Sequence, residues 1–374
     1  MAAPMKQIFW CGCRKNTLFT RNLLQKSRVF SVQRYCEQAE KDPSAKHHHH
    51  HHELKQPSNI WKYTIDKYIK FVGWYEVKLK RFPKAFHIYK LFKDGIAEFG
   101  SGAKTYASVS VDVWTGTPLD KFTRHQLEIY RQMPRDMLKV FPVLAISILP
   151  FANYVIFPIA YLVPRYLLSR QFWTPEQRIE FPLQDLKHRV DHYHKIFYAM
   201  RLNMKHIEHP LYKSKLEQVV DKLESKSHPK VEEILETKSL FEYGAYQLDE
   251  LSVTYAGHLS RSMLMSMSRR KLWEQAFILH HIDKALAKEG IEKLTESELQ
   301  QSCLARGLNP VGLSTDSMIA FLKTWTAVSS SLNEDNQSLL LHLPVLLTFH
   351  HPNNVKLYKK KRIAQMDRKM KASK

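Results

Sequence analysis

The stretch Phe141–Val163, FPVLAISILPFANYVIFPIAYLV, contains 23 residues and no charged side chain. Lys139 precedes it and Arg165 follows it. Because an α-helix rises about 1.5 Å per residue, a helix of this length reaches across a hydrocarbon core of about 30 Å. No other stretch of the chain is apolar over such a length. The sequence therefore predicts a single membrane-spanning helix at 141–163, in preference to a helix buried in a soluble core.

Prolines interrupt the predicted span at Pro142, Pro150 and Pro158. Each one removes a backbone N–H and leaves a carbonyl without its helical partner. In hydrocarbon, that carbonyl needs another helix, a polar side chain such as Asn153 or Ser147, or water. Two interpretations stay open: a kinked anchor, or a broken helix that lines a pathway after self-association. The absence of ionisable residues inside the span favours the anchor.

The N-terminal composition is typical of a mitochondrial transit peptide. Residues 1–36 contain seven Lys and Arg and no Asp or Glu, with hydroxyl and apolar residues between them. The segment Arg28–Ser31 resembles a presequence-protease site. A polar, His-rich linker follows at 37–59, and its run His47–His52 has no fixed geometry for a metal ion. We therefore assign the histidine run no function.

The formal net charge of +21 is unevenly distributed. Residues 164–355 carry 23 basic and 23 acidic side chains, whereas the basic tail 356–374 carries nine basic residues against Asp367 alone. Basic side chains bind polyanions because counterions are released, and in a neutral body they must act as local patches. Our candidates for contact with RNA, ribosomal protein or anionic lipid are Lys359, Lys360, Lys361 and Arg362 in the tail and Arg269, Arg270 and Lys271 in the body.

Beyond the linker the sequence predicts an all-α protein. It contains only 11 glycines and no sustained period-2 alternation. We expect an amphipathic helical region at 60–140, and after the span a helical body at 164–355 that is long enough for its own core. Within that body, Thr295–Glu298 has the form of a capping box, Gly290 and Gly307 end helices, and Ser314 or Thr315 begins another.

Sequence motifs of common enzymes are absent. The chain has no phosphate-binding glycine loop, no Gly-x-Ser-x-Gly, no His-Glu-x-x-His and no calcium loop. On helices, the histidines of His280-His281 and of His192-x-His194 point to different sides, so they make poor metal pairs. We therefore expect no enzymatic activity, no cofactor and no small-molecule substrate.

Two blocks of sequence motifs occur in order along the chain. The first lies in and around the predicted span, and the second lies nearer the C-terminus. The first comprises Gln132–Asp136, Phe141–Pro142, Leu149–Phe151, Pro158, Leu162–Pro164 and Phe172. The second comprises Glu289–Ile291, Leu294–Thr295, Glu298–Gln300, Cys303–Leu308, Trp325 and Ser338–Leu341. Together they resemble the LETM family, the leucine-zipper/EF-hand-containing transmembrane proteins of the mitochondrial inner membrane. The chain is most similar to the short members that lack the EF-hand and the zipper.

The resemblance implies a single-pass inner-membrane protein whose C-terminal domain, a LETM-type ribosome-binding domain, faces the matrix. It implies binding to the mitochondrial ribosome and to inner-membrane lipids, and a role in respiratory-complex biogenesis and mitochondrial structure. Arg306 occupies a motif position in that domain and joins the contact candidates. Lys and Arg near the span slightly favour the reverse topology, and here we follow the resemblance.

The alternative function is a component or regulator of cation/proton homeostasis, acting as an exchanger-like homo-oligomer. Ala152-Asn153 stands where the ion-exchanging members have an acidic residue. The EF-hand and the coiled coil are missing as well. Both departures weigh against exchange by this chain.

Overall fold

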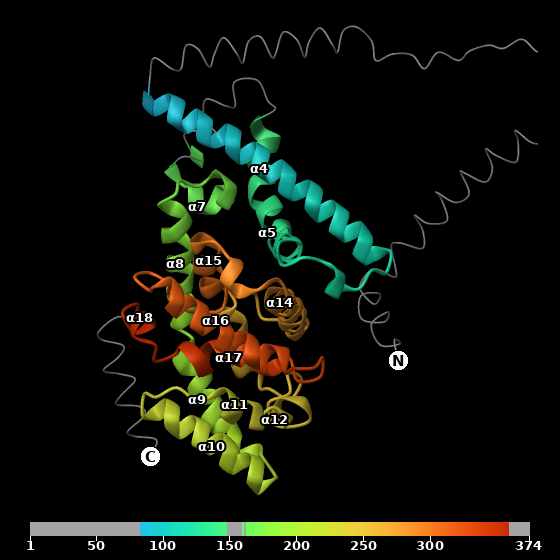
Figure 1. Ribbon diagram of the computed structural model, residues 1–374, viewed down its shortest axis with the longest axis vertical. Coiled ribbons are helices and arrows are strands. Elements are labelled where there is room, and N and C mark those ends of the chain that lie inside the picture. The colour runs from blue at the N-terminus through green and yellow to red at the C-terminus, as the bar shows by residue number, and fades with distance from the viewer. Residues whose placement is uncertain (1–82, 148–158, 161, 359–374) are drawn as a thin grey trace, which may run out of the picture. The chain divides into compact units, whose positions relative to one another are not determined.

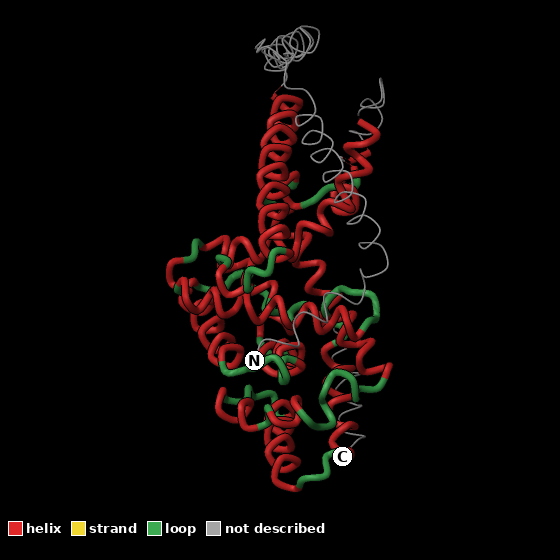
Figure 2. Tube along the Cα trace, turned by 90° about the vertical axis from the view of Figure 1, so that its right-hand side faces the viewer, coloured by secondary structure: helices red, strands yellow, loops and turns green. Residues whose placement is uncertain are grey.

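A computed structural model describes residues 83–147, 159–160 and 162–358, which form helices and no strands (Figures 1 and 2). All of them belong to one compact unit of the chain. The all-α prediction is thus confirmed for the described residues. The predicted transit peptide, the linker, residues 60–82 of the amphipathic region and the tail from residue 359 lie outside them.

The N-terminal helices precede and flank the predicted span. They are α4 (Pro83–Trp114), η1 (Leu119–Lys121), α5 (Arg124–Ser147), α7 (Pro164–Leu167) and η2 (Arg170–Phe172). The helices of the body follow. They are α8 (Gln177–Val190), α9 (Tyr193–Asn203), η3 (Met204–His206), α10 (Pro210–Glu224), α11 (Val231–Glu236), α12 (Ser239–Glu242), α13 (Val253–Ser262), α14 (Arg269–Glu289), η4 (Ile291–Lys293), α15 (Glu296–Ala305), α16 (Thr315–Ser330), α17 (Ser338–Thr348) and α18 (Pro352–Val355).

Helix α5 continues without a break through Pro142 to Ser147, the last described residue before residue 159. The end of the amphipathic region predicted at 60–140 and the start of the span predicted at 141–163 thus belong to one helix as far as Ser147. Over residues 83–147, 159–160 and 162–358, no helix combines the length and apolar character needed to cross a membrane. The remaining polar and kink positions of the predicted span, Pro150, Asn153 and Pro158, lie outside the described residues.

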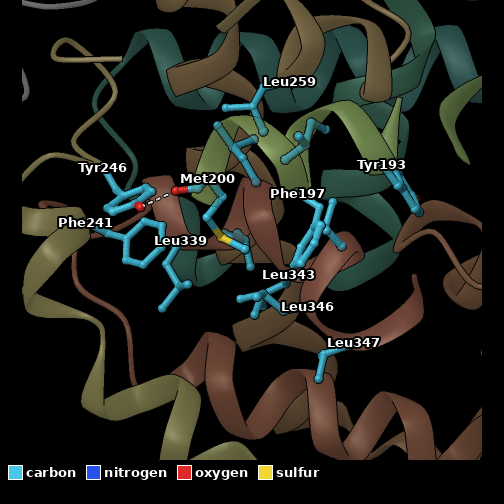
Figure 3. Packing of buried hydrophobic residues seen from close by; sticks show 14 of the residues in the cluster. Tyr193, Phe197, Met200, Phe241, Tyr246, Leu259, Leu339, Leu343, Leu346 and Leu347 are labelled. Carbon is cyan, nitrogen blue, oxygen red and sulfur yellow. Dashed lines mark hydrogen bonds between the residues drawn. The ribbon is translucent and has the colours of Figure 1, made fainter. Parts of the chain in front are cut away.

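The main core surrounds α17, which is buried from Ser338 to Thr348. A helix that is apolar on all sides, here LLLHLPVLL, is stable only when neighbours cover every face. Figure 3 shows Phe197 of α9 and Leu343 of α17 in this core, with the Tyr246 hydroxyl donating to the Met200 carbonyl at 2.5 Å. The core therefore forms around the most hydrophobic helix of the body.

His342 is the polar residue at the centre of α17. Its Nδ1–H donates to the Ser338 carbonyl at 2.7 Å, and its Nε2 accepts from the Tyr255 hydroxyl at 2.9 Å. Burial lowers the pKa of His342 to about 4, below the value of about 6.5 in an unfolded chain. The imidazole is therefore neutral in the native protein at pH 7.

The depressed pKa of His342 predicts acid sensitivity. Between pH 6.5 and 4 the unfolded chain binds a proton that the folded chain rejects, so stability falls as the pH falls. For His342 alone, the free energy of unfolding is about 2 kcal/mol lower at pH 5 than at neutral pH. We expect His342→Gln to destabilise the protein at pH 7.5 but to reduce its further loss of stability between pH 7.5 and 5, measured by urea unfolding. An equal pH-dependent loss in variant and wild type would contradict this.

The predicted helix ends in the C-terminal half are confirmed. Thr295 and Glu298 form a reciprocal capping box at α15, and the Ser314 hydroxyl accepts from the Ser317 N–H at α16. Gly290 and Gly307 have φ angles of 93° and 91°, in the region that favours glycine. Local chemistry alone therefore sets these boundaries.

A smaller hydrophobic cluster joins the start of α5 to α14. Leu127 of α5 packs with Phe277 and Ile282 of α14, and all three are buried. Residues on both sides of the predicted span thus share one core. The first turns of α5 therefore pack on the helical body that follows residue 164.

Candidate functional site

Large apolar side chains are exposed on both sides of residues 148–158. Leu138 and Phe141 on α5 are 78% and 69% exposed, and Leu162 and Tyr166 are 76% and 70% exposed. We call these four residues the apolar flanks. Pro142 lies among them and leaves the Leu138 carbonyl without a helical N–H donor. Single exposed apolar side chains are common on protein surfaces, but these four lie within or close to the uncharged stretch 141–163.

Polar contacts fix the apolar flanks to the rest of the protein. Arg165, which closes the predicted span, pairs with Asp185 of α8 at 2.5 Å. Asp136 of α5 accepts a hydrogen bond of 3.3 Å from Gln171, and burial raises the pKa of Asp136. The end of the predicted span is therefore held by side chains of α5 and α8.

The end of α13 and the start of α14 carry four basic residues in a stretch of sequence without Asp or Glu. No Asp or Glu occurs from residue 251 to residue 273. We call Arg261, Arg269, Arg270 and Lys271 the basic connection. Such a stretch concentrates basic side chains in one part of the sequence although residues 164–355 are neutral overall.

The three predicted contact residues of the basic connection differ in availability. The Arg269 guanidinium donates to the Leu251 carbonyl at 2.5 Å and is partly buried. Arg270 is exposed and pairs with Glu274 one turn later at 2.9 Å. Lys271 is exposed, and its ammonium donates to Ser266 at 3.1 Å. Arg270 and Lys271 can thus meet a partner directly, whereas Arg269 orders the connection.

His192, just before α9, and His258 of α13 lie near Arg261 and Lys195. The rings of His192 and His258 lie 5.6 Å apart. Burial, together with the nearby Lys195 and Arg261, lowers the pKa of both histidines, that of His192 to about 4. Both rings are therefore neutral at pH 7, and the positive charge comes from the Lys and Arg side chains.

Arg306 is not a surface contact, so this sequence prediction is wrong. Its side chain is 1% exposed, and its guanidinium pairs with the fully buried Asp283 at 2.5 Å. The other Asp283 oxygen accepts from Trp325 Nε1 at 2.8 Å and from the Ser329 hydroxyl at 2.6 Å. Arg306 thus joins the end of α15 to α14 and α16. A nucleic acid cannot reach it in the folded protein.

The acidic partner at this junction was not predicted from the sequence. Asp283 lies on α14 among Leu279, Ile282 and Leu286, all buried. A carboxylate on an apolar helical stripe is stable only with partners, and that signal could have predicted a buried ion pair. A second buried arginine, Arg189 of α8, donates to the carbonyls of Ser262, Leu304 and Ala305. Arg306 and Arg189 thus connect neighbouring helices of the domain through buried polar contacts.

A family model described as LETM1-like, RBD matches residues 122–346, more than half of the chain. The chain belongs to the LETM1-like family. The match begins before α5, includes the buried Asp283–Arg306 pair and ends within α17. The resemblance inferred from the two motif blocks is therefore confirmed. Pro150, Asn153, Pro158 and the four basic tail residues Lys359–Arg362 remain outside the described residues.

Similarity to curated proteins supports the same family membership. It is 31% identical over 303 residues to "LETM1 domain-containing protein 1" of Homo sapiens, covering 78% of this chain and 84% of the relative. The protein of the same name from Xenopus tropicalis is also 31% identical, over 304 residues, covering 79% and 84%. A "Mitochondrial proton/calcium exchanger protein" of Drosophila melanogaster is 26% identical over 230 residues, covering 59% of this chain and 22% of that relative. No solved structure matches this chain.

Proposed function

We propose that this LETM1-like protein is a single-pass protein of the mitochondrial inner membrane, and that its matrix-facing helical body binds the mitochondrial ribosome. In this role it supports the biogenesis of membrane proteins and respiratory complexes. The proposal rests first on the exposed basic connection of a neutral, LETM1-like body. The apolar flanks and the uncharged stretch at 141–163 support the membrane anchor.

Exposed positive charge supports the proposed ribosome contact at this surface. Arg270 and Lys271 present two exposed cations on adjacent residues, next to the partly exposed Leu264 and Met267. Phosphate oxygens of RNA attract such cations, and counterion release makes the contact salt-dependent. An apolar loop beside the cations adds contact area for bases or protein. The arrangement suits a contact with ribosomal RNA at the start of α14.

Neutralising the basic connection tests this contact. We expect Arg270→Gln with Lys271→Gln to weaken binding of the full-length protein to isolated mitochondrial ribosomes about tenfold, and to reduce the slope of log K against log salt by about one for each phosphate that is no longer bound. The matched control is Lys284→Gln with Lys288→Gln, two exposed cations on the same helix. Equal effects of both pairs, or no effect of the first, would refute a specific role of the connection.

The membrane anchor makes a separate prediction. We expect the wild-type protein to stay in the membrane pellet after alkaline carbonate treatment of mitochondria, and deletion of residues 141–163 to release it. Replacing the same residues by an uncharged Leu/Ala segment of equal length should restore the pellet, because hydrophobic length determines spanning. Release of the wild-type chain by carbonate would exclude the anchor.

A second candidate function is cation/proton homeostasis, favoured by the similarity to the Drosophila melanogaster exchanger. It requires an oligomer whose predicted spans line a pathway, since one helix cannot enclose a pore. On this hypothesis, Pro150→Ala with Asn153→Ala changes matrix pH or volume while ribosome binding stays normal. On the ribosome hypothesis, the same variant retains both matrix parameters and ribosome binding.

A further inference from the structure

Leu264 has an unusual backbone conformation just after α13. Its φ angle is 57°, in the left-handed region that residues other than glycine rarely adopt. Within the part of the chain that the structure describes, the one other residue with a side chain and a positive φ is Lys226, at 63°. A β-carbon in this region crowds the backbone, so the conformation destabilises the folded chain unless another interaction compensates for it.

Two backbone hydrogen bonds fix the conformation of Leu264. Its N–H donates to the Arg261 carbonyl at 3.0 Å, and the N–H of Met265 donates to the Ser260 carbonyl at 2.9 Å. These are the two bonds of a Schellman motif, in which the left-handed position is usually glycine. Glycine would therefore form the same helix end with less strain.

The Leu264 side chain compensates only in part by burial, because it is 43% exposed. Met267, in the same connection between α13 and α14, is also 43% exposed. The neighbouring Met263 is buried and Met265 packs on the main core. Single exposed apolar side chains are common, but an exposed leucine at a position suited to glycine indicates a role in binding.

Exposed cations lie on both sides of Leu264 in the sequence. Arg261 precedes it on α13, and Arg270 and Lys271 follow it on α14; all three are exposed. The Lys271 ammonium donates to the Ser266 hydroxyl at 3.1 Å, which places this cation beside the connection. A partner that covers Leu264 is therefore favoured by acidic groups or phosphates at the edge of the contact.

A pocket in a protein suits this arrangement better than RNA bases or a bilayer. Bases stack on aromatic rings or guanidinium planes, and residues 263–268 contain no aromatic residue and no Arg. Insertion into a bilayer requires a larger apolar face than two partly exposed side chains provide. An aliphatic side chain on a backbone fixed by hydrogen bonds loses little conformational entropy when it enters a pocket of matching shape.

We propose that Leu264 is an apolar anchor that inserts into an apolar pocket of a protein on the ribosome surface. The inference rests on the proposed ribosome binding and deepens it, because it assigns part of that contact to a protein beside the RNA. Met267 would extend the apolar contact. Arg270 and Lys271 would bind the neighbouring phosphates.

Leu264→Gly separates binding from stability. The melting temperature of the full-length protein in detergent should change little, because relief of strain offsets the loss of partial burial. Affinity for isolated mitochondrial ribosomes should fall about tenfold, with an unchanged slope of log K against log salt, because no cation is lost. Leu264→Met, which retains an apolar side chain, should keep most of the affinity.

Lys226→Gly is the matched control. Lys226 occupies the same position of a Schellman motif at the end of α10, where its N–H donates to the Leu223 carbonyl at 3.2 Å and that of Ser227 donates to the Lys222 carbonyl at 2.9 Å. The control relieves the same kind of strain away from the connection. We expect it to leave ribosome affinity unchanged.

The outcomes distinguish this inference from the ribosome contact itself. Salt-dependent binding by the wild type with unchanged affinity of Leu264→Gly would overturn the anchor and leave the ribosome contact standing. An equal loss in Lys226→Gly, or an equal loss of Leu264→Gly binding to ribosomal RNA stripped of protein, would overturn the protein pocket. A wild type that does not bind ribosomes would refute the proposed function and the anchor together.

Discussion

Arg306→Met is expected to lower the free energy of unfolding by about 3–5 kcal/mol, because it leaves the Asp283 carboxylate buried without its cation. The pair is almost fully buried, with side-chain exposures of 1% and 0%. Trp325 and Ser329 still donate to Asp283 in the variant, but neither of them carries a charge. Urea unfolding of the full-length protein in detergent, followed by far-UV circular dichroism, measures the change.

Arg270→Met is the matched control for Arg306→Met. Arg270 also pairs with a carboxylate, that of Glu274, but its side chain is 60% exposed. Exposed pairs contribute about 0–1 kcal/mol, so this variant should unfold almost like the wild type. Similar destabilisation in both variants would contradict a special role of the buried Arg306–Asp283 pair. So would a decrease in the free energy of unfolding under about 1 kcal/mol for Arg306→Met.

Gly307→Ala is expected to cost about 3 kcal/mol. At φ 91° an L side chain is strained by about 1–3 kcal/mol. A Cβ there would also overlap the buried Tyr193 hydroxyl and lie 3.1 Å from Pro344 Cβ, and overpacking typically adds 1–3 kcal/mol.

Gly312→Ala separates backbone strain from overlap. Gly312 has φ 76°, and no heavy atom of the described residues lies within 4 Å of the position that an alanine methyl would take, so only the backbone strain applies. We expect a decrease in stability of about 1 kcal/mol there. Thermal melts of the two variants should differ clearly, and equal melting temperatures would contradict the tight packing of Gly307 against Tyr193.

The C-terminal helices were largely predictable from the sequence because their ends carry local signals. Thr295 with Glu298, Ser314, and the glycines after α14 and α15 act within a few residues, so no tertiary knowledge was needed. The helical spacing of Met318, Ile319, Leu322 and Trp325 in the sequence also indicates one apolar face of α16. Met318, Leu322 and Trp325 are buried, and Ile319 is partly buried.

The role of Arg306 could not be predicted from charge alone. An arginine near a helix end reads as a surface contact, and only the packing of α14, α15 and α16 shows that it is enclosed. The same holds for α5, whose first turns precede the predicted span but pack on α14 through Leu127 and Phe277. Long-range packing of this kind leaves little trace in residue spacing.

The basic connection was only partly predictable from the sequence. Its three consecutive basic residues, Arg269 to Lys271, were evident in the sequence, but their availability was not. In the structure the Arg269 guanidinium donates to the Leu251 carbonyl, whereas Arg270 and Lys271 are exposed. Experiments on ribosome binding should therefore target the last two residues.

The most direct test of the central claim is sedimentation of the full-length, epitope-tagged protein from mitochondria lysed in mild detergent. We expect it to travel with ribosomal particles at low salt and to leave them progressively as the salt concentration rises. A protein that stays at the top of the gradient at low salt, while ribosomes remain intact, would contradict the account and direct attention to ion homeostasis.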